Sequence, residues 1–420
     1  MAQPSHDTLP PSDWTPADSL ALYNIEGWGN GYFTVDSDGH LLVRPKGPAG
    51  GAIDLETMVR ELQDRGIGLP LLVRFSELVE SRLEEIHEAF RAAIDDAGYA
   101  GRFQGVYPIK VNQDRHLVER LVSYGQRHHF GLEAGSKPEL LAVIALVEDP
   151  EALIVCNGYK DEEYIEIALL ASKLGRRTVL VVEKPAELPL IAKVAERTGL
   201  RPRLGLRSRL SSRGSGHWQE SGGERSKFGL SGRELVAATE FLAEHDMLDA
   251  CQLLHFHRQP AGRDPGREGR HPGGRLGLRQ PLPAGSGAAL PDVGGGLGID
   301  YDGTQTERAS STNYTLQEYA NDVVWGVQEI CRPAGVAMPT LVTESGRATV
   351  AHHAALILDV LGTAAVPEEL EPSEPPPTAR RPCACSGTPT WGPTRGTRSR
   401  STTTPWPTAI SRSTSSGSAS

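Results

Sequence analysis

The chain has 420 residues, a formal net charge of −10 and 38% hydrophobic residues. Together its 46 Gly and 31 Pro residues form a larger share of the chain than the ordinary share of about 12%. Their share stays below the roughly 25–30% that marks a low-complexity chain. The length allows two or three domains, or one large α/β barrel with an attachment. The acidic balance argues against a nucleic-acid-binding surface.

No transmembrane helix is expected, because no run of about 18 apolar residues occurs. The N-terminus lacks the basic start and apolar stretch of a secretory signal. Five cysteines are too few and too scattered for a disulfide framework. These features predict a cytoplasmic protein that does not enter membranes.

The first part of the chain predicts a small N-terminal unit. Residues 1–20 are polar and predict a disordered lead. Residues 21–46 alternate aromatic and β-branched residues with turn residues, which predicts short strands with a tight turn at 37–39. Apolar spacing predicts helices over 54–65 and 76–97. We assign 21–75 to a β and helical segment.

Short apolar runs, most of them followed by a helical pattern, repeat through the next part of the chain, which we assign to residues 76–365. Three helices should begin with Ser/Thr-x-x-Glu capping boxes, at Ser136, Ser231 and Thr315. Eight such units predict an α/β fold, a (β/α)8 TIM barrel. The runs are 103–110, 129–134, 152–156, 178–183, 202–207, 251–257, 290–294 and 340–345.

Two stretches interrupt this rhythm. Residues 258–290 hold 8 Gly, 6 Arg and 5 Pro, and no apolar helix face can be drawn there. Residues 366–420 form a tail rich in Ser, Thr and Pro. Such segments bury too little apolar surface to offset chain entropy. They predict a flexible insertion and a disordered, low-complexity tail.

Active sites of such barrels lie at the carboxyl ends of the strands, which selects candidate residues. Lys110 ends the first run, where it is either a Schiff-base lysine or a salt-bridged rim residue. Glu133, Asn157 and Arg207 end later runs. His257 could stack on a flat cofactor or be structural, and His255, two residues earlier, could be the functional histidine instead.

A glycine run and a charged pair follow the last two strands. Gly294, Gly295 and Gly296 form either an ordinary turn or a cradle for phosphate. Glu344 and Arg347 either pair with each other or serve a cofactor, Glu344 at a ring nitrogen and Arg347 at the phosphate. Arg209 and Lys227 flank a Gly/Ser-rich loop that is either a lid or a plain surface loop.

Taken together, several runs resemble the biosynthetic arginine decarboxylase family. They are YPIKVNQ (107–113), GLEAGSKPEL (131–140), IVCNGYKD (154–161), GSGHWQESGGERSKFGL (214–230), LLHFH (253–257), DVGGGLGIDYDG (292–303) and TESGRA (343–348). The resemblance covers roughly 20–257 and 291–365. It implies a pyridoxal phosphate (PLP) enzyme on the barrel of alanine racemase and ornithine decarboxylase.

The resemblance also implies roles for individual residues. Lys110 matches the Schiff-base lysine, His257 the ring-stacking histidine and Glu344 the carboxylate at the pyridine nitrogen. The three glycines match the phosphate loop and Arg347 its supporting arginine, whereas Glu133, Asn157 and Arg207 match mouth residues of less defined role. The stretch presented to substrate is Asp292, Val293, Gly294, Gly295, Gly296, Leu297, Gly298, Ile299, Asp300 and Tyr301.

The implied reaction is a carboxy-lyase step that converts L-arginine to agmatine and CO2 in arginine catabolism and in polyamine (putrescine and spermidine) biosynthesis. The family also uses Mg²⁺, for which no ligands can be assigned, and forms homodimers or higher homo-oligomers. Two alternatives remain: a related ornithine or diaminopimelate decarboxylase, and a non-catalytic paralogue that retains the barrel.

The chain departs from the family pattern at 258–290 and after about 370. The C-terminal β-domain of the family, with its catalytic cysteine, is not recognisable, and Cys383 and Cys385 lack the family's flanking residues. Pro291 intrudes on a barrel strand. We hypothesise reading-frame shifts at both places, which the nucleotide sequence around codons 258, 290 and 370 would decide. We further expect incomplete barrel closure and little decarboxylase activity.

Overall fold

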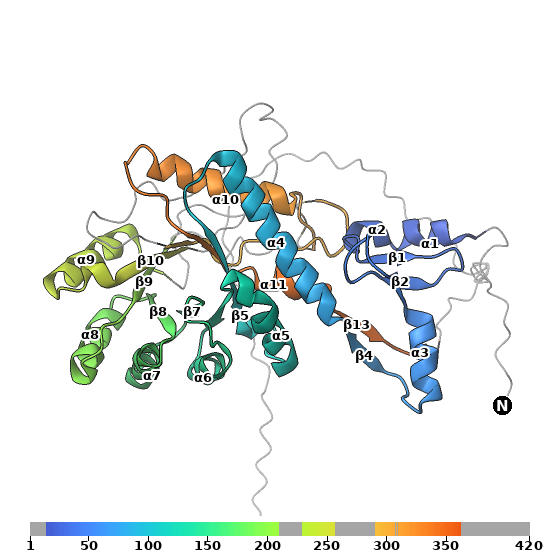
Figure 1. The fold of residues 1–420 in the computed structure, drawn as a ribbon, viewed down its shortest axis with the longest axis horizontal. Coiled ribbons are helices and arrows are strands. Elements are labelled where there is room, and N and C mark those ends of the chain that lie inside the picture. Colours follow the sequence, from blue (N-terminus) through green and yellow to red (C-terminus); the bar gives the residue numbers. More distant parts are fainter. Residues whose placement is uncertain (1–13, 210–228, 257–289, 307, 309, 363–420) are drawn as a thin grey trace, which may run out of the picture. The chain divides into compact units, whose positions relative to one another are not determined.

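The computed structural model describes residues 14–209, 229–256, 290–306, 308 and 310–362. Its centre is a closed barrel of parallel strands in the order β10-β11-β12-β5-β6-β7-β8-β9 (Figure 1). Six strands lie within the predicted runs, and β8 and β9 each extend one residue beyond theirs, so the predicted (β/α)8 barrel is confirmed. The strands are β5 (Phe103–Pro108), β6 (Gly131–Ala134), β7 (Leu153–Cys156), β8 (Arg177–Val182), β9 (Leu204–Ser208), β10 (Cys251–Phe256), β11 (Leu290–Asp292) and β12 (Leu341–Thr343).

The expectation of incomplete closure is wrong. Strand β11 pairs with β10 over its whole length, with Pro291 opposite Leu254. Its pairing with β12 depends on residues beyond the proline: Asp292 lies opposite Val342, and the Val293 N–H donates to the Val342 carbonyl at 3.0 Å. Strand β12 in turn pairs with β5. The ladder therefore loses the donor at Pro291 without opening the ring.

Alternate residues of each strand face the inside of the barrel. The inward layer is apolar and fully packed, as expected for a barrel of this strand number. Residues of opposite parity, such as Ile154, Leu180 and Leu206, belong to a separate cluster between strands and helices. The inward cluster consists of Val106, Leu153, Val155, Val179, Val181, Leu253, Leu290 and Val342.

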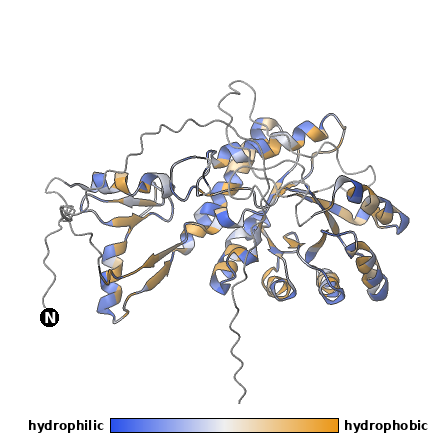
Figure 2. Cartoon of the chain, turned by 180° about the vertical axis from the view of Figure 1, so that it is seen from behind, coloured by the Kyte–Doolittle hydropathy of each residue, from blue (hydrophilic) through white to orange (hydrophobic). Residues whose placement is uncertain are grey.

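Helices surround the barrel and turn their apolar sides toward it (Figure 2). The longest, α4 (Ser76–Ala97), buries Leu83, Ile86 and Phe90 on one face and ends at Gly98, whose φ of 56° suits glycine. The helices that follow the barrel strands are α5 (Arg115–Gly125), α6 (Lys137–Leu146), α7 (Glu162–Lys173), α8 (Glu187–Thr198), α9 (Gly232–Glu244), α10 (Leu316–Cys331) and α11 (Gly346–Val350). Short 3-10 turns are η1 (Ile109–Val111), η2 (Gln126–His128) and η4 (Leu248–Ala250).

Two of the three predicted capping boxes form. Ser231 and Thr315 each exchange hydrogen bonds with the glutamate three residues later, at the starts of α9 and α10. The prediction of a capping box at Ser136 is wrong. The Ser136 side chain makes no capping hydrogen bond, and the Glu139 carboxylate instead accepts the Gly135 N–H at 2.7 Å. Glu139 thereby ties the start of α6 to the end of β6.

The N-terminal unit contains more helix than the sequence predicts. Within the expected disordered lead, α1 (Pro16–Leu22) begins at a capping box between Thr15 and Asp18. Part of the expected strand region is α2 (Ile25–Trp28). The hairpin of β1 (Phe33–Val35) and β2 (Leu41–Val43) encloses the predicted turn, and β3 (Ile53–Asp54) leads into the predicted helix α3 (Leu55–Asp64).

Two distant segments form a separate ribbon beside the barrel. Strand β4 (Leu71–Arg74) precedes α4, and β13 (Ala354–Ile357) follows α11. They pair antiparallel, with Ala354 opposite Arg74 (Figure 1). Phe75 donates its N–H to the His353 carbonyl at 2.7 Å, which fastens the start of α4 to the chain after the last barrel strand.

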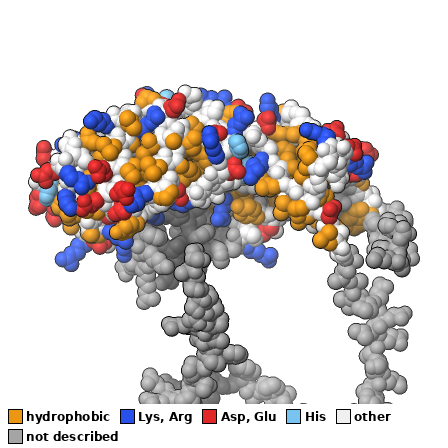
Figure 3. Space-filling view, turned by 90° about the horizontal axis from the view of Figure 1, so that it is seen from below, with side chains coloured by type: hydrophobic (Ala, Val, Ile, Leu, Met, Phe, Trp, Pro, Cys, Tyr) orange, Lys and Arg blue, Asp and Glu red, His pale blue; other side chains and the backbone are white. Residues whose placement is uncertain are grey.

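The surface of the described residues carries both charged and apolar side chains. On the face shown in Figure 3, acidic and basic side chains are interspersed with apolar ones. No helix in the described part of the chain is long and apolar enough to cross a membrane. Cys156, Cys251 and Cys331 are buried free thiols.

The loop after β7 passes very close to the loop after β6. A Cβ added to Gly158 would lie 2.2 Å from the Gly135 carbonyl oxygen, whereas one added to Gly175 meets nothing within 4 Å. Both glycines have positive φ, 75° and 84°. Gly158→Ala should therefore lower the free energy of unfolding by about 1–3 kcal/mol more than Gly175→Ala, because only Gly158→Ala adds a clash. Urea denaturation of both variants measures the difference, and equal losses would contradict this packing.

Candidate functional site

A ring of polar side chains lies directly above the apolar layer of the barrel. Its members lie at or just after the ends of the eight barrel strands. On β7, β8 and β10–β12 they stand two residues beyond an apolar inward residue, whereas Lys110 follows Val106 by four residues. The ring occupies the carboxyl ends of the strands, where barrel enzymes place their active sites. Its members are Lys110, Glu133, Asn157, Glu183, Arg207, His255, Asp292 and Glu344.

The ring members differ in exposure according to charge. Its carboxylates, His255 and Asn157 are all buried. The side chains of Lys110 and Arg207 are 54% and 20% exposed, so these two cations are the ring members that face solvent. Buried carboxylates are stable only when paired or hydrogen-bonded. The mouth of the barrel therefore exposes its two cations to solvent, and the carboxylates with which they pair are buried below them.

Lys110 and Glu133 form the first pair, across β5 and β6. The Lys110 Nζ lies 3.1 Å from both oxygens of Glu133. Partial burial would lower the pKa of Lys110, but the carboxylates of Glu133 and Glu344 outweigh it and raise that pKa above its ordinary value. Lys110 is thus an ammonium held over a fully buried acid.

Arg207 and Glu183 form the second pair, across β9 and β8. Burial alone would raise the pKa of Glu183, but Arg207 and the buried Lys160 lower it. Lys160 lies 3.4 Å from Glu187, and Glu187 accepts the Glu183 N–H at 2.9 Å. Sequence analysis missed Glu183, although it ends the fourth predicted run at the inward parity of Val179 and Val181.

The third group links three strand ends in the deepest part of the mouth. His255 Nδ1 lies 2.9 Å from Asp292 Oδ2 and 3.6 Å from Glu344 Oε1. Asn157 reaches across the barrel and donates to Glu344 Oε1 at 2.8 Å. The other oxygen of Asp292 accepts the Gly294 N–H at 2.9 Å. The histidine found in this group is His255, which sequence analysis gave as the alternative to His257.

Burial and like charge dominate the ionisation of this group. Burial, followed by the charge of Asp292, raises the pKa of Glu344 to about 8. Burial would lower the pKa of His255, but the charges of Asp292 and Glu344 outweigh it and raise that pKa. Burial would likewise raise the pKa of Asp292, but His255 lowers it. Asp292 and Glu344 thus favour the charged form of His255, His255 favours the charged form of Asp292, and Glu344 beside them keeps its proton at neutral pH.

The predicted glycine run follows β11 directly. Gly294 is buried with a φ of 69°, and Gly295 and Gly296 are more open. The Tyr314 hydroxyl accepts the Gly298 N–H at 2.8 Å and donates to the Gly296 carbonyl at 3.2 Å, which holds this loop in place. Arg347 is exposed in the first turn of α11, three residues beyond Glu344.

The rest of the predicted substrate stretch leaves the mouth. Val293, Leu297 and Ile299 are buried, whereas the Tyr301 side chain is exposed. Asp300 accepts from the Ser311 hydroxyl at 2.7 Å. A cavity of about 190 Å³ adjoins Leu297, Gly298, Ile299 and Asp300. His257, the loop carrying Lys227, Cys383 and Cys385 lie outside the described residues, so the structure does not test them.

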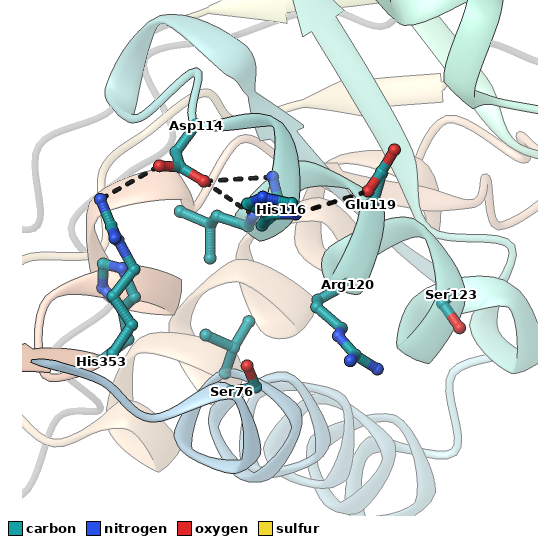
Figure 4. Close-up of a pocket in the computed structure, with 10 residues that line it drawn as sticks. Ser76, Asp114, His116, Glu119, Arg120, Ser123 and His353 are labelled. Atoms are coloured by element: carbon teal, nitrogen blue, oxygen red, sulfur yellow. Dashed lines mark hydrogen bonds and ion pairs between the residues drawn. The ribbon is translucent and has the colours of Figure 1, made fainter. Parts of the chain in front are cut away.

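A larger cavity, of about 460 Å³, lies away from the mouth (Figure 4). It opens between the start of α4 and α5 and is lined by Arg74, Ser76, Asp114, Arg120 and His353, among others. Arg74 pairs with Asp114 at 3.1 Å, and Asp114 caps α5. None of the eight ring residues lines this cavity, so it is separate from the strand-end site.

Comparison with known proteins agrees with this geometry. Residues 80–351 match the family model described as "Pyridoxal-dependent decarboxylase, pyridoxal binding domain". The biosynthetic arginine decarboxylase of Prochlorococcus marinus strain MIT 9303 is 49% identical over 356 residues, 84% of this chain and 55% of that protein. That of Gloeobacter violaceus is 45% identical over 372 residues, 88% and 57% of the two chains.

Solved structures show the same fold. The biosynthetic arginine decarboxylase of Campylobacter jejuni superimposes with a TM-score of 0.64 at 34% identity, covering 80% of this chain and 53% of that one. A diaminopimelate decarboxylase of M. jannaschii gives 0.57 at 20% identity, with coverages of 78% and 69%, and shares the fold alone. The chain spans about half the length of the curated relatives it matches. Its barrel, its strand-end lysine and the matched family model together show that this chain belongs to the pyridoxal-dependent decarboxylase family.

Proposed function

We propose that this chain supplies the PLP-binding barrel of an arginine decarboxylase, which converts L-arginine to agmatine and CO2 in polyamine biosynthesis. The observation that carries the proposal is Lys110 at the mouth of a closed barrel, paired with Glu133 and facing the floor that contains Glu344. Arginine is favoured as substrate because the relatives at 45–49% identity bear that name. The homo-oligomer implied by the resemblance stays a prediction.

The described residues fit the chemical groups of PLP. Lys110 provides the amine for its aldehyde, Glu344 a carboxyl for its ring nitrogen, and Gly294–Gly296 with Arg347 a site for its phosphate. Asn157 Oδ1 is buried and has no hydrogen-bond partner within the described residues, which leaves an acceptor for a donor on the bound group. When bound, PLP supplies an electron sink for the carbon that loses CO2.

The chain's own residues would prepare each end of that site. Glu133 is the nearest acceptor for the proton that Lys110 must lose before its amine can react. Glu344 holds a proton at neutral pH and Asn157 fixes its orientation, so it can donate to a ring nitrogen. Arg207, held by Glu183, presents a cation at the rim, where an anionic cofactor or substrate would enter.

Magnesium, which the resemblance implies, does not fit the described residues. Two groups of possible ligands occur there, one of Asp36, His40 and Asp54 and one of His255, Asp292 and Glu344. Each contains a histidine already bonded to a carboxylate, whereas Mg²⁺ prefers an octahedral shell of oxygens and water. We therefore assign no step of the reaction to magnesium.

The first test is capture of PLP. The purified chain mixed with PLP should develop the visible absorbance of lysine-bound cofactor, and borohydride reduction should place the label on the peptide that contains Lys110. Lys110→Ala should lose that absorbance and label. Lys193→Ala, an exposed lysine of α8, is the matched control and should retain both. Equal labelling of several lysines would contradict the proposal.

The second test uses pH. The pKa of Glu344 is raised to about 8 in the folded chain, whereas an unfolded glutamate titrates near about 4.3. Between these values the folded state binds the extra proton, so stability falls as pH rises through that window. Glu344→Gln should flatten the fall between about pH 5 and pH 8. Urea unfolding across this range measures it, and Glu240→Gln, an exposed residue of α9, should keep the wild-type slope.

The third test concerns substrate. Arginine should perturb the visible absorbance of the PLP-loaded chain at lower concentration than ornithine or diaminopimelate. Agmatine and CO2 should form slowly, in keeping with the departures at 258–290 and after 370. A preference for ornithine or diaminopimelate would replace arginine as the substrate. No response to any of the three would favour a non-catalytic barrel.

A further inference from the structure

The buried pair of His255 and Asp292 is not used by the reaction as derived above. Both residues are inaccessible to solvent, with 1% and 0% exposure. Their 2.9 Å contact lies beneath Glu344, 3.6 Å from its Oε1. Asp292 also binds the Gly294 N–H, and the Glu344 N–H donates to the Gly294 carbonyl at 2.9 Å. The pair is therefore fixed to the same backbone as the carboxyl it faces.

The ionisable groups around Glu344 are arranged on every neighbouring strand. Asp292 on β11 and Glu133 on β6 oppose a negative charge on Glu344, whereas His255 on β10 and Lys110 after β5 favour it. Arg207 on β9 opposes a positive charge on His255, and Glu183 after β8 interacts electrostatically with His255. Lys110 and Glu133 neutralise each other at 3.1 Å. Burial favours the neutral form of Glu344 most strongly, and among its charged neighbours the two members of the buried pair act on it first, Asp292 against its charge and His255 in favour of it.

We propose that His255 and Asp292 are positioning residues that together adjust, on top of the effect of burial, how readily Glu344 gives up its proton. Asp292 holds the proton on Glu344 by its negative charge, and His255 limits that effect by pairing with Asp292. The two act in opposite directions on one carboxyl. That this carboxyl serves the ring nitrogen of PLP rests on the proposed function, whereas the coupling of the three groups does not.

The proposal predicts opposite shifts from two conservative substitutions. Asp292→Asn removes the negative charge while its amide oxygen can still accept the Gly294 N–H. Glu344 should then lose its proton at lower pH, with its proton affinity reduced about tenfold or more. His255→Gln removes the positive charge beside Asp292. Glu344 should then hold its proton to higher pH, with a shift of similar size.

The experiment is a carboxyl ¹³C NMR titration of the 420-residue chain labelled at glutamate, without PLP. The signal missing from Glu344→Gln identifies Glu344. The midpoint of its titration should move down in Asp292→Asn and up in His255→Gln. A second Asp–His pair, Asp149 with His129 at 2.8 Å, lies outside the mouth. Asp149→Asn and His129→Gln are therefore matched controls and should leave the midpoint unchanged.

Each outcome decides the proposal. Midpoints that stay in place, or that move in the same direction in both variants, overturn it. If Asp292→Asn does not fold, as judged by circular dichroism, an unmoved or lowered midpoint in His255→Gln overturns it and a raised midpoint supports it.

A repeat with PLP separates this inference from the proposed function. If the wild-type chain captures no PLP, the proposed function fails while the titration still decides the coupling. If PLP is captured, the pH at which capture is half-maximal should move in opposite directions in the two variants. Unmoved capture alongside moved titration midpoints would overturn the role of the pair at the cofactor.

Discussion

Closure of the barrel is the constraint on which the site depends. In a closed ring of strands every second side chain must point into a shared interior, and that interior has room for layers of side chains and no water. The lower layer of this barrel is Val and Leu. Polar residues lie above it at or just after the end of each strand, so closure gathers residues from eight separate places in the sequence into one ring.

That ring buries more acid than a protein interior tolerates without compensation. The structure resolves this by pairing neighbouring strands: β5 with β6, β8 with β9, and β10 with β11. Glu344 lies 3.6 Å from His255, which is already paired with Asp292, and is held across the barrel by Asn157. Burial raises its pKa, so that a proton on Glu344 takes the place of a counter-charge of its own. Lys110 and Arg207 stay nearest to solvent, so the reactive amine is accessible while its partner is not.

The features that the sequence did not predict each have their own physical cause. Helix α1 begins with a capping box of Thr15 and Asp18, a local signal that the polar composition of the lead obscured. At Ser136 the box residues are present, but Glu139 finds a better-placed donor at Gly135. Incomplete closure was expected and Pro291 removes a ladder donor, yet the strand pairs with β12 through residues beyond the proline. The alternation of residues 179, 181 and 183 places Glu183 on the inward side of its strand, although the sequence analysis did not select it as a site residue.

The sequence by itself determined the fold class, the eight strands and most of the strand-end residues, because apolar periodicity and strand parity are local properties of the chain. Its motifs also indicated the family that the comparisons show. Only the tertiary structure decided the partners: Lys110 with Glu133, Arg207 with Glu183, and His255 with Asp292 beneath Glu344. These contacts depend on the order of strands around the ring and on burial. The ionisation of Glu344 is therefore a property of the closed barrel, and no stretch of sequence carries it alone.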